Sequence, residues 1–273
     1  MRLGRLALIT VTAFCVLVPL ADLAARAGAR PSASTAGHSR RIWVPTPHTT
    51  WQWQLTGPVD QSVAASMFDI DLFDNSASVV ASLHRHAHRV ICYLDAGTYE
   101  NYRPDARRFP RSVLGKPNGW PGERWLDVRR LSVLEPIMRS RLQMCRRKGF
   151  DGVEADNVDG YTNDTGFHLT ASDQLTYDKW LAQTAHGLGL SIALKNDLDQ
   201  ARQLEPYFDY ALDEQCFQYI ECSQLRPFAD AHKAVFEVEY YLSTQSFCAR
   251  ANADGFMSMR KDLNLDATRQ PCW

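Results

Sequence analysis

The sequence lacks the short motifs that mark common nucleotide and metal sites. No G-x-G-x-x-G follows the first strand-like segment and no G-x4-G-K-[ST] occurs, so a nucleotide-binding fold loses its main support. No C-x2-C pair is present, which counts against a structural zinc site. A basic excess is also lacking, because 30 Lys and Arg residues face 31 Asp and Glu residues. That balance argues against a nucleic-acid-binding protein.

The longest apolar run near the N-terminus is too short to span a bilayer. It covers residues 6–20, whereas a transmembrane helix needs about 20 residues. Two arginines precede the run and an Ala-Arg-Ala site follows it at 25–27, which is the layout of a secretory signal peptide. We therefore expect residues 1–27 to be removed and residues 28–41 to form a flexible arm. The mature protein is predicted to be secreted, with no stable membrane insertion after signal cleavage.

Removing the signal peptide leaves an acidic chain with an even number of cysteines. Three Arg and one Asp are lost, so 27 basic and 30 acidic residues remain, a net charge of −3 with His neutral. An even cysteine count in an exported protein favours disulfides, with zinc ligation as the alternative. The first pairing that we expect joins Cys216 to Cys222, which are six positions apart. The disulfide candidates are Cys92, Cys145, Cys216, Cys222, Cys248 and Cys272.

Short apolar or β-rich segments alternate with helical patterns along the chain. The predicted strands are 50–55, 67–73, 89–97, 151–156, 191–196, 208–214, 234–240 and 255–261. The predicted helices are 76–88, 131–149, 170–189, 198–207, 222–232 and 243–255. Such alternation is typical of βαβ units in a parallel sheet. Eight strands in a chain of this length favour a (β/α)8 TIM barrel, formed as one domain by residues 42–273.

A long insertion interrupts this alternation after the third predicted strand. It covers residues 98–130 and contains four prolines together with Trp120 and Trp125. Long loops inside a compact domain are usually functional. In a barrel the insertion would lie at the C-terminal ends of the strands, where active sites of this fold are built.

Side-chain alternation within two strands places two carboxylates at strand ends, as one of several possible pairs. In the strand 151–156, Val153 and Ala155 suit contact with helices, so Glu154 and Asp156 should face the barrel axis. The same parity places Glu214 at the C-terminal end of the strand 208–214. Two strand-end carboxylates across a barrel mouth fit glycoside hydrolysis, although Asp95, Glu237 and Glu239 satisfy similar arguments.

Other acidic and histidine residues have simpler interpretations. Asp74 and the residues after it offer a helix N-cap, and the spacing of a calcium loop is not met. Asp159 and Asp164 lie beside glycines in a turn-rich loop and are expected to be solvated turn formers. His84 and His88 share one face near a helix end, where a solvated face is favoured over a metal site.

Several blocks of the sequence together resemble one enzyme family. The blocks are WQWQLTGPVD, DIDLFDNS, VICYLDAGTYENYRPDA, VLGKPNGWPGERWLDVR, GFDGVEADNVDGYTNDTGFHLTA, ALKNDLDQ, DEQCFQYIEC and VFEVEY. They resemble, from about Trp51 to Tyr240, the endo-α-1,4-polygalactosaminidases of glycoside hydrolase family 114. The resemblance implies a secreted (β/α)8 enzyme that cuts within chains of α-1,4-linked galactosamine, with Asp156 and Glu214 as its catalytic acids. We assign Asp156 as nucleophile and Glu214 as acid/base, which predicts retention of anomeric configuration.

The implied substrate is a cationic galactosamine-containing polysaccharide, and this gives roles to further residues. Acidic side chains in a cleft would attract its ammonium groups. Lysine and asparagine would hydrogen-bond hydroxyls, and tryptophans would stack on sugars or simply pack. The predicted substrate-binding residues are Asp71, Asp95, Glu154, Asn157, Lys195, Asn196, Glu239, Trp51, Trp120 and Trp125.

The predicted enzyme needs no cofactor or metal and is expected to be a monomer. Three alternatives remain open at this stage. One is a catalytically inactive carbohydrate-binding barrel, and another is a hydrolase of a different α-linked glycan. The third is a metal-dependent phosphodiesterase, which would need histidine ligands at strand ends, and none of the eight histidines lies in such a motif.

Overall fold

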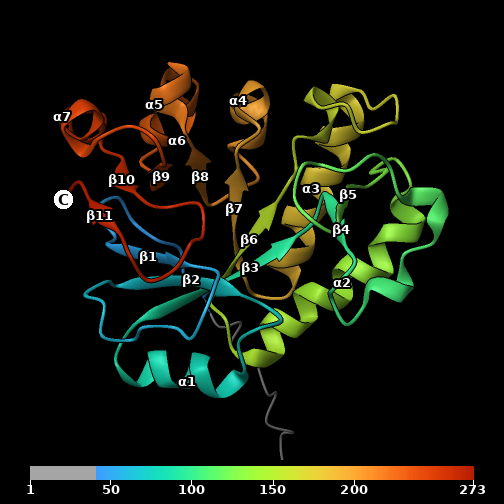
Figure 1. Cartoon of the computed structure of the whole chain (residues 1–273), viewed down its shortest axis with the longest axis horizontal. Helices are drawn as coiled ribbons and strands as arrows, with labels where there is room; N and C mark the ends of the chain where they lie inside the picture. Colours follow the sequence, from blue (N-terminus) through green and yellow to red (C-terminus); the bar gives the residue numbers. More distant parts are fainter. Residues whose placement is uncertain (1–40) are drawn as a thin grey trace, which may run out of the picture. The chain divides into compact units, whose positions relative to one another are not determined.

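Eight parallel strands form one curved sheet in the part of the chain that the structure describes, residues 41–273 of a computed structural model. The strands follow one another in the order of the sequence, and Figure 1 shows the helices on the outer side of the curve. The strands are β1 (Trp51–Gln54), β2 (Met67–Asp71), β3 (Arg89–Asp95), β6 (Gly152–Asp156), β7 (Ser191–Lys195), β8 (Tyr210–Glu214), β9 (Val235–Glu239) and β10 (Met257–Arg260). All eight predicted strands are confirmed, as is the α/β fold class.

The two faces of the sheet carry different cores. Side chains such as Val153 and Ala155 pack into the apolar layer between strands and helices, as the alternation predicted. The inner face carries a second cluster that includes Trp51, Tyr210 and Phe236. Both faces are therefore buried, which is the usual condition of strands in parallel sheets.

The first and last parallel strands, β1 and β10, are not joined by backbone hydrogen bonds of a shared β-ladder. β1 pairs only with β2, whereas β10 pairs with β9 and with the short antiparallel strand β11 (Gln270–Pro271). Side chains and loop backbone connect the two edges: Trp51 Nε1 donates to Met257 O at 2.8 Å, and Leu55 N donates to Leu265 O at 2.9 Å. The segment after β10 thus lies beside β1 and becomes part of the mouth of the sheet.

The helices follow most of the predicted pattern. The helices are α1 (Ala77–Arg85), α2 (Leu131–Lys148), α3 (Ala171–Gly187), α4 (Ala201–Leu204), α5 (Cys216–Tyr219), α6 (Arg226–Asp230) and α7 (Thr244–Asp254). α3 begins with a capping box between Thr170 and Asp173. The predicted helices 198–207 and 222–232 are each divided between a 3-10 turn and a short α-helix. No helix joins β1 to β2, so the first β/α unit is reduced to a loop.

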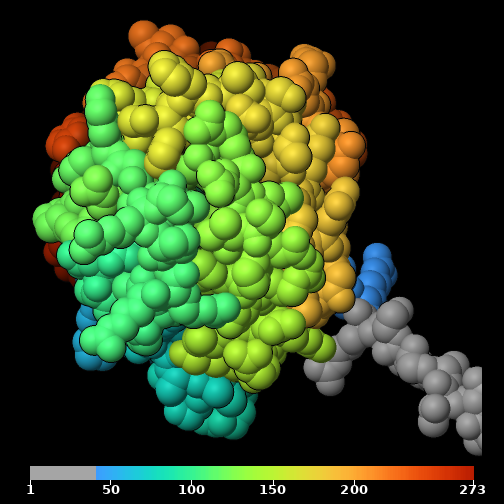
Figure 2. Space-filling model, turned by 90° about the vertical axis from the view of Figure 1, so that its right-hand side faces the viewer, coloured from blue at the N-terminus to red at the C-terminus, as the bar shows by residue number. Residues whose placement is uncertain are grey.

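The insertion after β3 folds against α2 and the loop after β6. It contains a two-stranded antiparallel sheet of β4 (Thr98–Glu100) and β5 (Glu123–Trp125). Figure 2 shows the insertion, in green, lying against the yellow-green segment that includes α2. Arg108 donates to the Pro136 carbonyl of α2, and Lys116 pairs with Asp164 of the loop after β6. These contacts fix the insertion beside the C-terminal end of β6.

All six predicted cysteines form disulfides. Cys92 of β3 is joined to Cys145 of α2, Cys248 of α7 to Cys272, and Cys216 to Cys222. The last pair confirms the pairing expected from spacing, and it closes the loop directly after Glu214. Within residues 41–273, no helix combines the length and apolar character needed to cross a bilayer. The predicted signal peptide and nearly all of the predicted arm lie outside the described residues.

Removing the Cys92–Cys145 bond should destabilise the protein more than removing the Cys216–Cys222 bond. The first closes a loop of 53 positions and the second a loop of 6. Chain-entropy arguments give about 4 kcal/mol for the long loop and about 2 kcal/mol for the short one. Paired Cys→Ser variants compared by urea unfolding test this order. Equal losses of unfolding free energy for the two variants would contradict the entropic explanation.

Candidate active site

A cleft opens where the parallel strands end at their carboxyl side. One part is a cavity of about 220 Å³ lined by Trp53, Tyr93, Asp156, Lys195 and Glu214, among others. A second and larger cavity of about 760 Å³ shares Glu214 and continues toward the loops after β6, β7 and β8. The end of the sheet where (β/α)8 enzymes place their active sites is therefore hollow in this protein.

Asp156, the last residue of β6, is held as a carboxylate. Its Oδ1 accepts hydrogen bonds from Lys195 Nζ and from the backbone N–H of Asn157, both at 2.8 Å, and its Oδ2 accepts from the Tyr93 hydroxyl at 2.8 Å. Burial by itself raises the pKa of Asp156, but the Lys195 charge and these hydrogen bonds outweigh it and bring the pKa below its usual value. A side chain that stays ionised and aims into a cleft suits a nucleophile.

The backbone at Asp156 is tightly fixed. Its carbonyl accepts from the N–H groups of Ala96 and Gly97, each at 3.0 Å. A Cβ on Gly97 would lie 1.5 Å from the Asn157 carbonyl oxygen, so only glycine permits the ends of β3 and β6 to approach this closely. Asn157 adopts a positive φ of 60° and donates from Nδ2 to Asp95 Oδ2 at 2.9 Å. Asp95 therefore acts by orienting Asn157.

Glu214 ends β8 on the neighbouring side of the cleft. Its carboxylate accepts from the Tyr240 hydroxyl and lies 2.9 Å from Lys195 Nζ. Asn196 forms a two-way contact with Glu214, accepting from its backbone N–H at 3.0 Å and donating to its Oε2 at 3.4 Å. About a quarter of the Glu214 side chain is exposed, at 24%, so a substrate oxygen can reach it.

Lys195, at the end of β7, connects the two predicted catalytic acids. Its side chain is 1% exposed, and its Nζ lies 2.8 Å from Asp156, 2.9 Å from Glu214 and 3.2 Å from Glu154. Because one nitrogen contacts both strand-end acids, their nearest oxygens lie within about 6 Å of each other, so both can act on one glycosidic bond. Lys195 is therefore held by three carboxylates, and its predicted contact with sugar hydroxyls stays a prediction.

Beneath this group two buried acids share the floor of the site. Glu154 accepts from Trp53 Nε1 at 2.9 Å and is inaccessible to solvent. Burial raises its pKa to about 7, against the lowering effect of Lys195. Asp69 of β2 lies next to it, and burial together with the Glu154 charge raises the Asp69 pKa well above its usual value. The protonated form of Asp69 is thus favoured, and Glu154 contacts Lys195 without reaching the cleft.

Four other predicted substrate-binding residues lie away from the cleft, which corrects those expectations. Asp71 is buried and pairs with Arg103 of the insertion, whose Nη1 lies 3.0 Å from Asp71 Oδ1. Glu239 points to the outer face of β9, where its Oε1 accepts from the N–H groups at the start of α5. Trp51 is fully buried and packs on Phe236, with ring centroids 4.9 Å apart. The fourth, Trp125, is 7% exposed and packs at the base of the insertion.

Trp120 keeps its predicted place, whereas Asp159 does not. Trp120 is 55% exposed and lines both parts of the cleft. Asp159, expected to be a solvated turn former, lines the larger cavity, and burial raises its pKa to about 6. Asp164 is exposed and pairs with Lys116, in agreement with the turn interpretation.

Asp95, at the end of β3, forms a cluster with two acids of the insertion. Oxygens of Asp95, Glu100 and Glu123 all lie within 4.8 Å of one another, a spacing that a metal ion could use. Arg103 Nε lies 2.6 Å from Glu100, and Arg141 lies 3.4 Å from the same carboxylate. These two guanidinium groups also pair with Asp71 and Asp105, so they tie Glu100 to the structure around the site.

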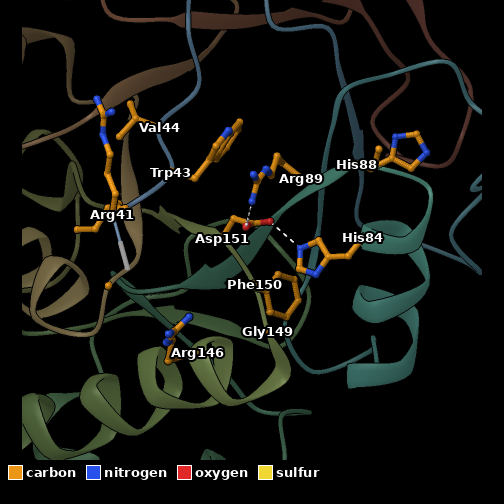
Figure 3. A pocket seen from close by; sticks show the side chains of 13 residues that line it. Arg41, Trp43, Val44, His84, His88, Arg89, Arg146, Gly149, Phe150 and Asp151 are labelled. Atoms are coloured by element: carbon orange, nitrogen blue, oxygen red, sulfur yellow. Dashed lines mark hydrogen bonds and ion pairs between the residues drawn. The ribbon is translucent and has the colours of Figure 1, made fainter. Parts of the chain in front are cut away.

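Another cavity lies at the opposite end of the sheet. It measures about 780 Å³ and is bordered by the N-terminal ends of β3 and β6, as seen in Figure 3. Its central acid, Asp151, accepts from His84 at 2.7 Å, from Arg89 at 2.9 Å and from the Val90 N–H at 2.9 Å. This carboxylate is satisfied by structural partners, so the pairing fastens α1 to the sheet.

Sequence reasoning missed three aromatic side chains of the site. Tyr93 has the same strand parity as Asp95, and Tyr240 follows the last residue of β9, so alternation places both toward the cleft. Trp53 alternates with Gln52 and Gln54 on β1 and reaches Glu154. Strand alternation could have identified these three residues. Aromatic residues on buried strands ordinarily pack in the core, however, so alternation alone does not assign them to a functional site.

The buried acids predict that stability decreases as the pH rises. Burial raises the pKa values of Asp159, Glu154 and Asp197 to about 6, 7 and 8. Because each folded pKa lies above its unfolded value near ~4, the folded state holds protons that the unfolded state releases, and this stabilisation is lost as the pH rises through 6 to 8. We expect the melting temperature to fall by about 5–10 °C between pH 5.5 and 8.5. Circular dichroism melts measure it, and an unchanged or rising melting temperature would refute the prediction.

A pair of carboxylates at strand ends in a cleft of an α/β fold is the arrangement that glycoside hydrolases with two catalytic acids use. The chain belongs to glycoside-hydrolase family GH114, whose model matches residues 32–273. It is similar to Ega3 of Aspergillus fumigatus, solved in complex with galactosamine, at 39% identity over 85% of this chain and 98% of that chain, with a TM-score of 0.81. The protein is therefore a glycosidase, and the predicted family is confirmed.

More distant structures share the fold. The glycoside hydrolase domain of PelA from Pseudomonas aeruginosa aligns at 12% identity, over 81% of this chain and 96% of that chain, with a TM-score of 0.62. The α-galactosidase TtGalA from Thermus thermophilus, in complex with stachyose, aligns at 13% identity, over 83% and 64% of the two chains, with a TM-score of 0.54. None of the curated proteins matches this chain.

Proposed function

We propose that this protein is a secreted, monomeric endo-glycosidase that hydrolyses α-1,4-linked galactosamine polymers with retention of configuration. The observation that carries the proposal is the placement of Asp156 and Glu214 on one buried ammonium, Lys195, at the floor of an open cleft. The similarity to Ega3, which was solved with galactosamine, supports the sugar. The three disulfides support an oxidising, extracellular location.

The proposed reaction uses the two acids in sequence. Asp156 attacks the anomeric carbon while Glu214 protonates the departing glycosidic oxygen, so the C–O bond breaks and a glycosyl–Asp156 ester forms. Glu214, now a carboxylate, takes a proton from water, which attacks the same carbon and releases Asp156. Tyr93 and Lys195 hold Asp156 ionised, and Tyr240 holds the Glu214 carboxyl in place.

The charge of the cleft agrees with a cationic substrate. The larger cavity is lined by Asp159, Asp197, Asp199, Asp213 and Glu221, besides Glu214 itself. An ammonium-bearing polymer would be attracted by these carboxylates and would form charge-assisted hydrogen bonds with them.

The proposal is tested with purified mature protein on de-N-acetylated α-1,4-galactosamine polymer. Reducing ends and mass spectra should show short oligosaccharides, and NMR should show the α-anomer of the new end first. Fully N-acetylated polymer serves as the neutral control. Intact galactosamine polymer after prolonged incubation would contradict the proposed substrate, and a β-anomer appearing first would contradict retention.

A further inference from the structure

A buried acid outside the cleft holds the segment that follows Glu214. Glu239 ends β9 and is inaccessible to solvent. Its Oε1 accepts from the backbone N–H groups of Phe217 at 2.8 Å and Gln218 at 3.1 Å, in the first turn of α5. The N-cap residue of this helix, Gln215, provides no side-chain cap. Glu239 therefore supplies, from another strand, the acceptor that the start of α5 needs.

The start of α5 determines how the chain leaves Glu214. Only Gln215 separates Glu214 from Cys216, the first residue of α5. Gln215 has a positive φ of 68°, and its N–H donates to the Val238 carbonyl of β9 at 2.8 Å. The Cys216–Cys222 disulfide then closes the loop. In so sharp a turn, a displacement of α5 would be transmitted directly to the end of β8.

The segment that contains Glu239 also contacts the Glu214 side chain. Tyr240 follows Glu239 in the sequence, and its hydroxyl donates to the Glu214 carboxylate on the inner side of the sheet. Three consecutive residues of this segment thus act on the end of β8: Val238 through its carbonyl, Glu239 through α5 and Tyr240 through its hydroxyl.

A second buried acid supports Glu239 from behind. Glu237 lies two positions earlier on the same face of β9 and is also inaccessible to solvent. Its carboxyl group is hydrogen-bonded to Glu239 and to the Ser258 hydroxyl of β10. Two carboxyl groups form such a bond only when one of them carries a proton. Burial and the Glu239 charge raise the pKa of Glu237 well above its usual value, so the proton lies on Glu237.

The neighbours of this acid pair do not neutralise it by an ion pair. Asp213 of β8 is the register partner of Glu237 and adds a further buried carboxyl group. Arg260 of β10 is the register partner of Glu239, but its Nε donates to the Tyr240 carbonyl at 3.4 Å. Within residues 41–273, no ion pair joins Arg260 to either acid. The shared proton therefore keeps Glu239 buried and oriented toward α5.

Resting on the proposed function, we propose that Glu239 is a positioning residue for Glu214: with Glu237 behind it, it anchors the start of α5 and so keeps the Glu214 carboxyl group directed at the departing glycosidic oxygen. Asp156 lies on β6, two strands away from β8, and does not depend on this anchor. Loss of the anchor should impair protonation of the leaving group and leave the nucleophilic attack largely unaffected.

Three variants separate the hydrogen bonds of the anchor from its volume. Glu239→Met keeps nearly the same shape but has no oxygen for the two N–H groups. Glu239→Gln keeps a carbonyl oxygen for them, and its amide can donate to Glu237 in place of the shared proton. Glu237→Gln likewise donates to Glu239. Should Glu239→Met not fold, Glu239→Asp withdraws the oxygen from α5 by one methylene and serves the same purpose.

The control is a buried acid with a purely structural place far from Glu214. Asp151→Leu removes the acceptor that holds His84 and Arg89 at the opposite end of the sheet. It should destabilise the fold without affecting one catalytic step more than another. Circular dichroism melts establish that every variant is folded at the assay temperature.

The readout is the rate on two substrates that differ in their need for an acid. Cleavage of galactosamine polymer requires protonation of the leaving oxygen, whereas the first turnover of an aryl glycoside of an α-1,4-galactosamine oligosaccharide does not. Glu239→Met should lower kcat on polymer about ten- to hundredfold, a part of what a general acid contributes, and keep the aryl burst near the wild-type rate. Both Gln variants should stay near wild type on both substrates, and Asp151→Leu should change the two rates by the same factor.

Equal losses on both substrates with Glu239→Met, or full activity of this variant on polymer, would overturn the inference alone. So would a loss with Glu239→Gln as large as with Glu239→Met, because the glutamine retains the acceptor. If the wild type does not cut galactosamine polymer, or if Glu214→Gln cuts it at the wild-type rate, the proposed function fails and this role of Glu239 fails with it.

Discussion

Glu214→Gln is expected to lower kcat on galactosamine polymer by about 10²–10⁴-fold, and Asp156→Asn by at least as much. Glutamine cannot protonate the departing oxygen, and asparagine cannot form the glycosyl ester. In the part of the cleft that contains both residues, the other acid lining the wall is Glu123 of the insertion, which is hydrogen-bonded to Asn118 and Tyr102. Among the described residues of that wall, no other acid is therefore free to replace Asp156 or Glu214.

A substrate with a better leaving group separates the two roles. An aryl glycoside of an α-1,4-galactosamine oligosaccharide does not need protonation of its leaving oxygen, so Glu214→Gln should release the aryl group at nearly the wild-type rate in a burst. Asp156→Asn should remain inactive on it. The two residues would have the opposite roles if Asp156→Asn gave the burst, and neither assignment would stand if both variants kept wild-type activity on polymer.

Lys195→Met is expected to cause the second large loss, of both stability and activity. The side chain is 1% exposed and its nitrogen lies within 3.2 Å of three carboxylates, so its removal leaves them facing one another without a cation. Removing one partner of a buried ion pair costs about 3–5 kcal/mol. The Asp156 pKa, which Lys195 lowers, should rise and move the acid limb of kcat/KM to higher pH.

The pH profile distinguishes this positioning role from a direct contact with sugar. Unfolding free energy by urea titration and kcat/KM from pH 3 to 8 are measured for Lys195→Met. Lys116→Met is the control, because Lys116 forms an exposed pair with Asp164 that is worth about 1 kcal/mol or less. A raised KM with an unmoved acid limb would show that Lys195 binds sugar hydroxyls after all.

Local sequence patterns determined the fold class and the direction in which the two predicted catalytic acids point. Period-2 alternation is a property of a single strand, so Val153 and Ala155 on one face were enough to turn Asp156 to the other. The same reasoning placed Glu214 at a strand end. The six-residue spacing of Cys216 and Cys222 predicted their disulfide, since few conformations of so short a loop keep them apart.

Only the tertiary structure decided which of the other acids work at the cleft. Every residue of β9 is buried, so the apolar pattern around Glu239 could not mark its inner face, and the carboxylate caps α5 instead. The sequence shows no partner for Asp71, so it was predicted to bind substrate. In the fold it pairs with Arg103, which is distant in the sequence. Asp197 gave no local signal, because its burial beside Asp159 depends on two loops meeting. Strand parity follows from the backbone of one segment, whereas the partner of a charge depends on chain segments that only the complete fold brings together.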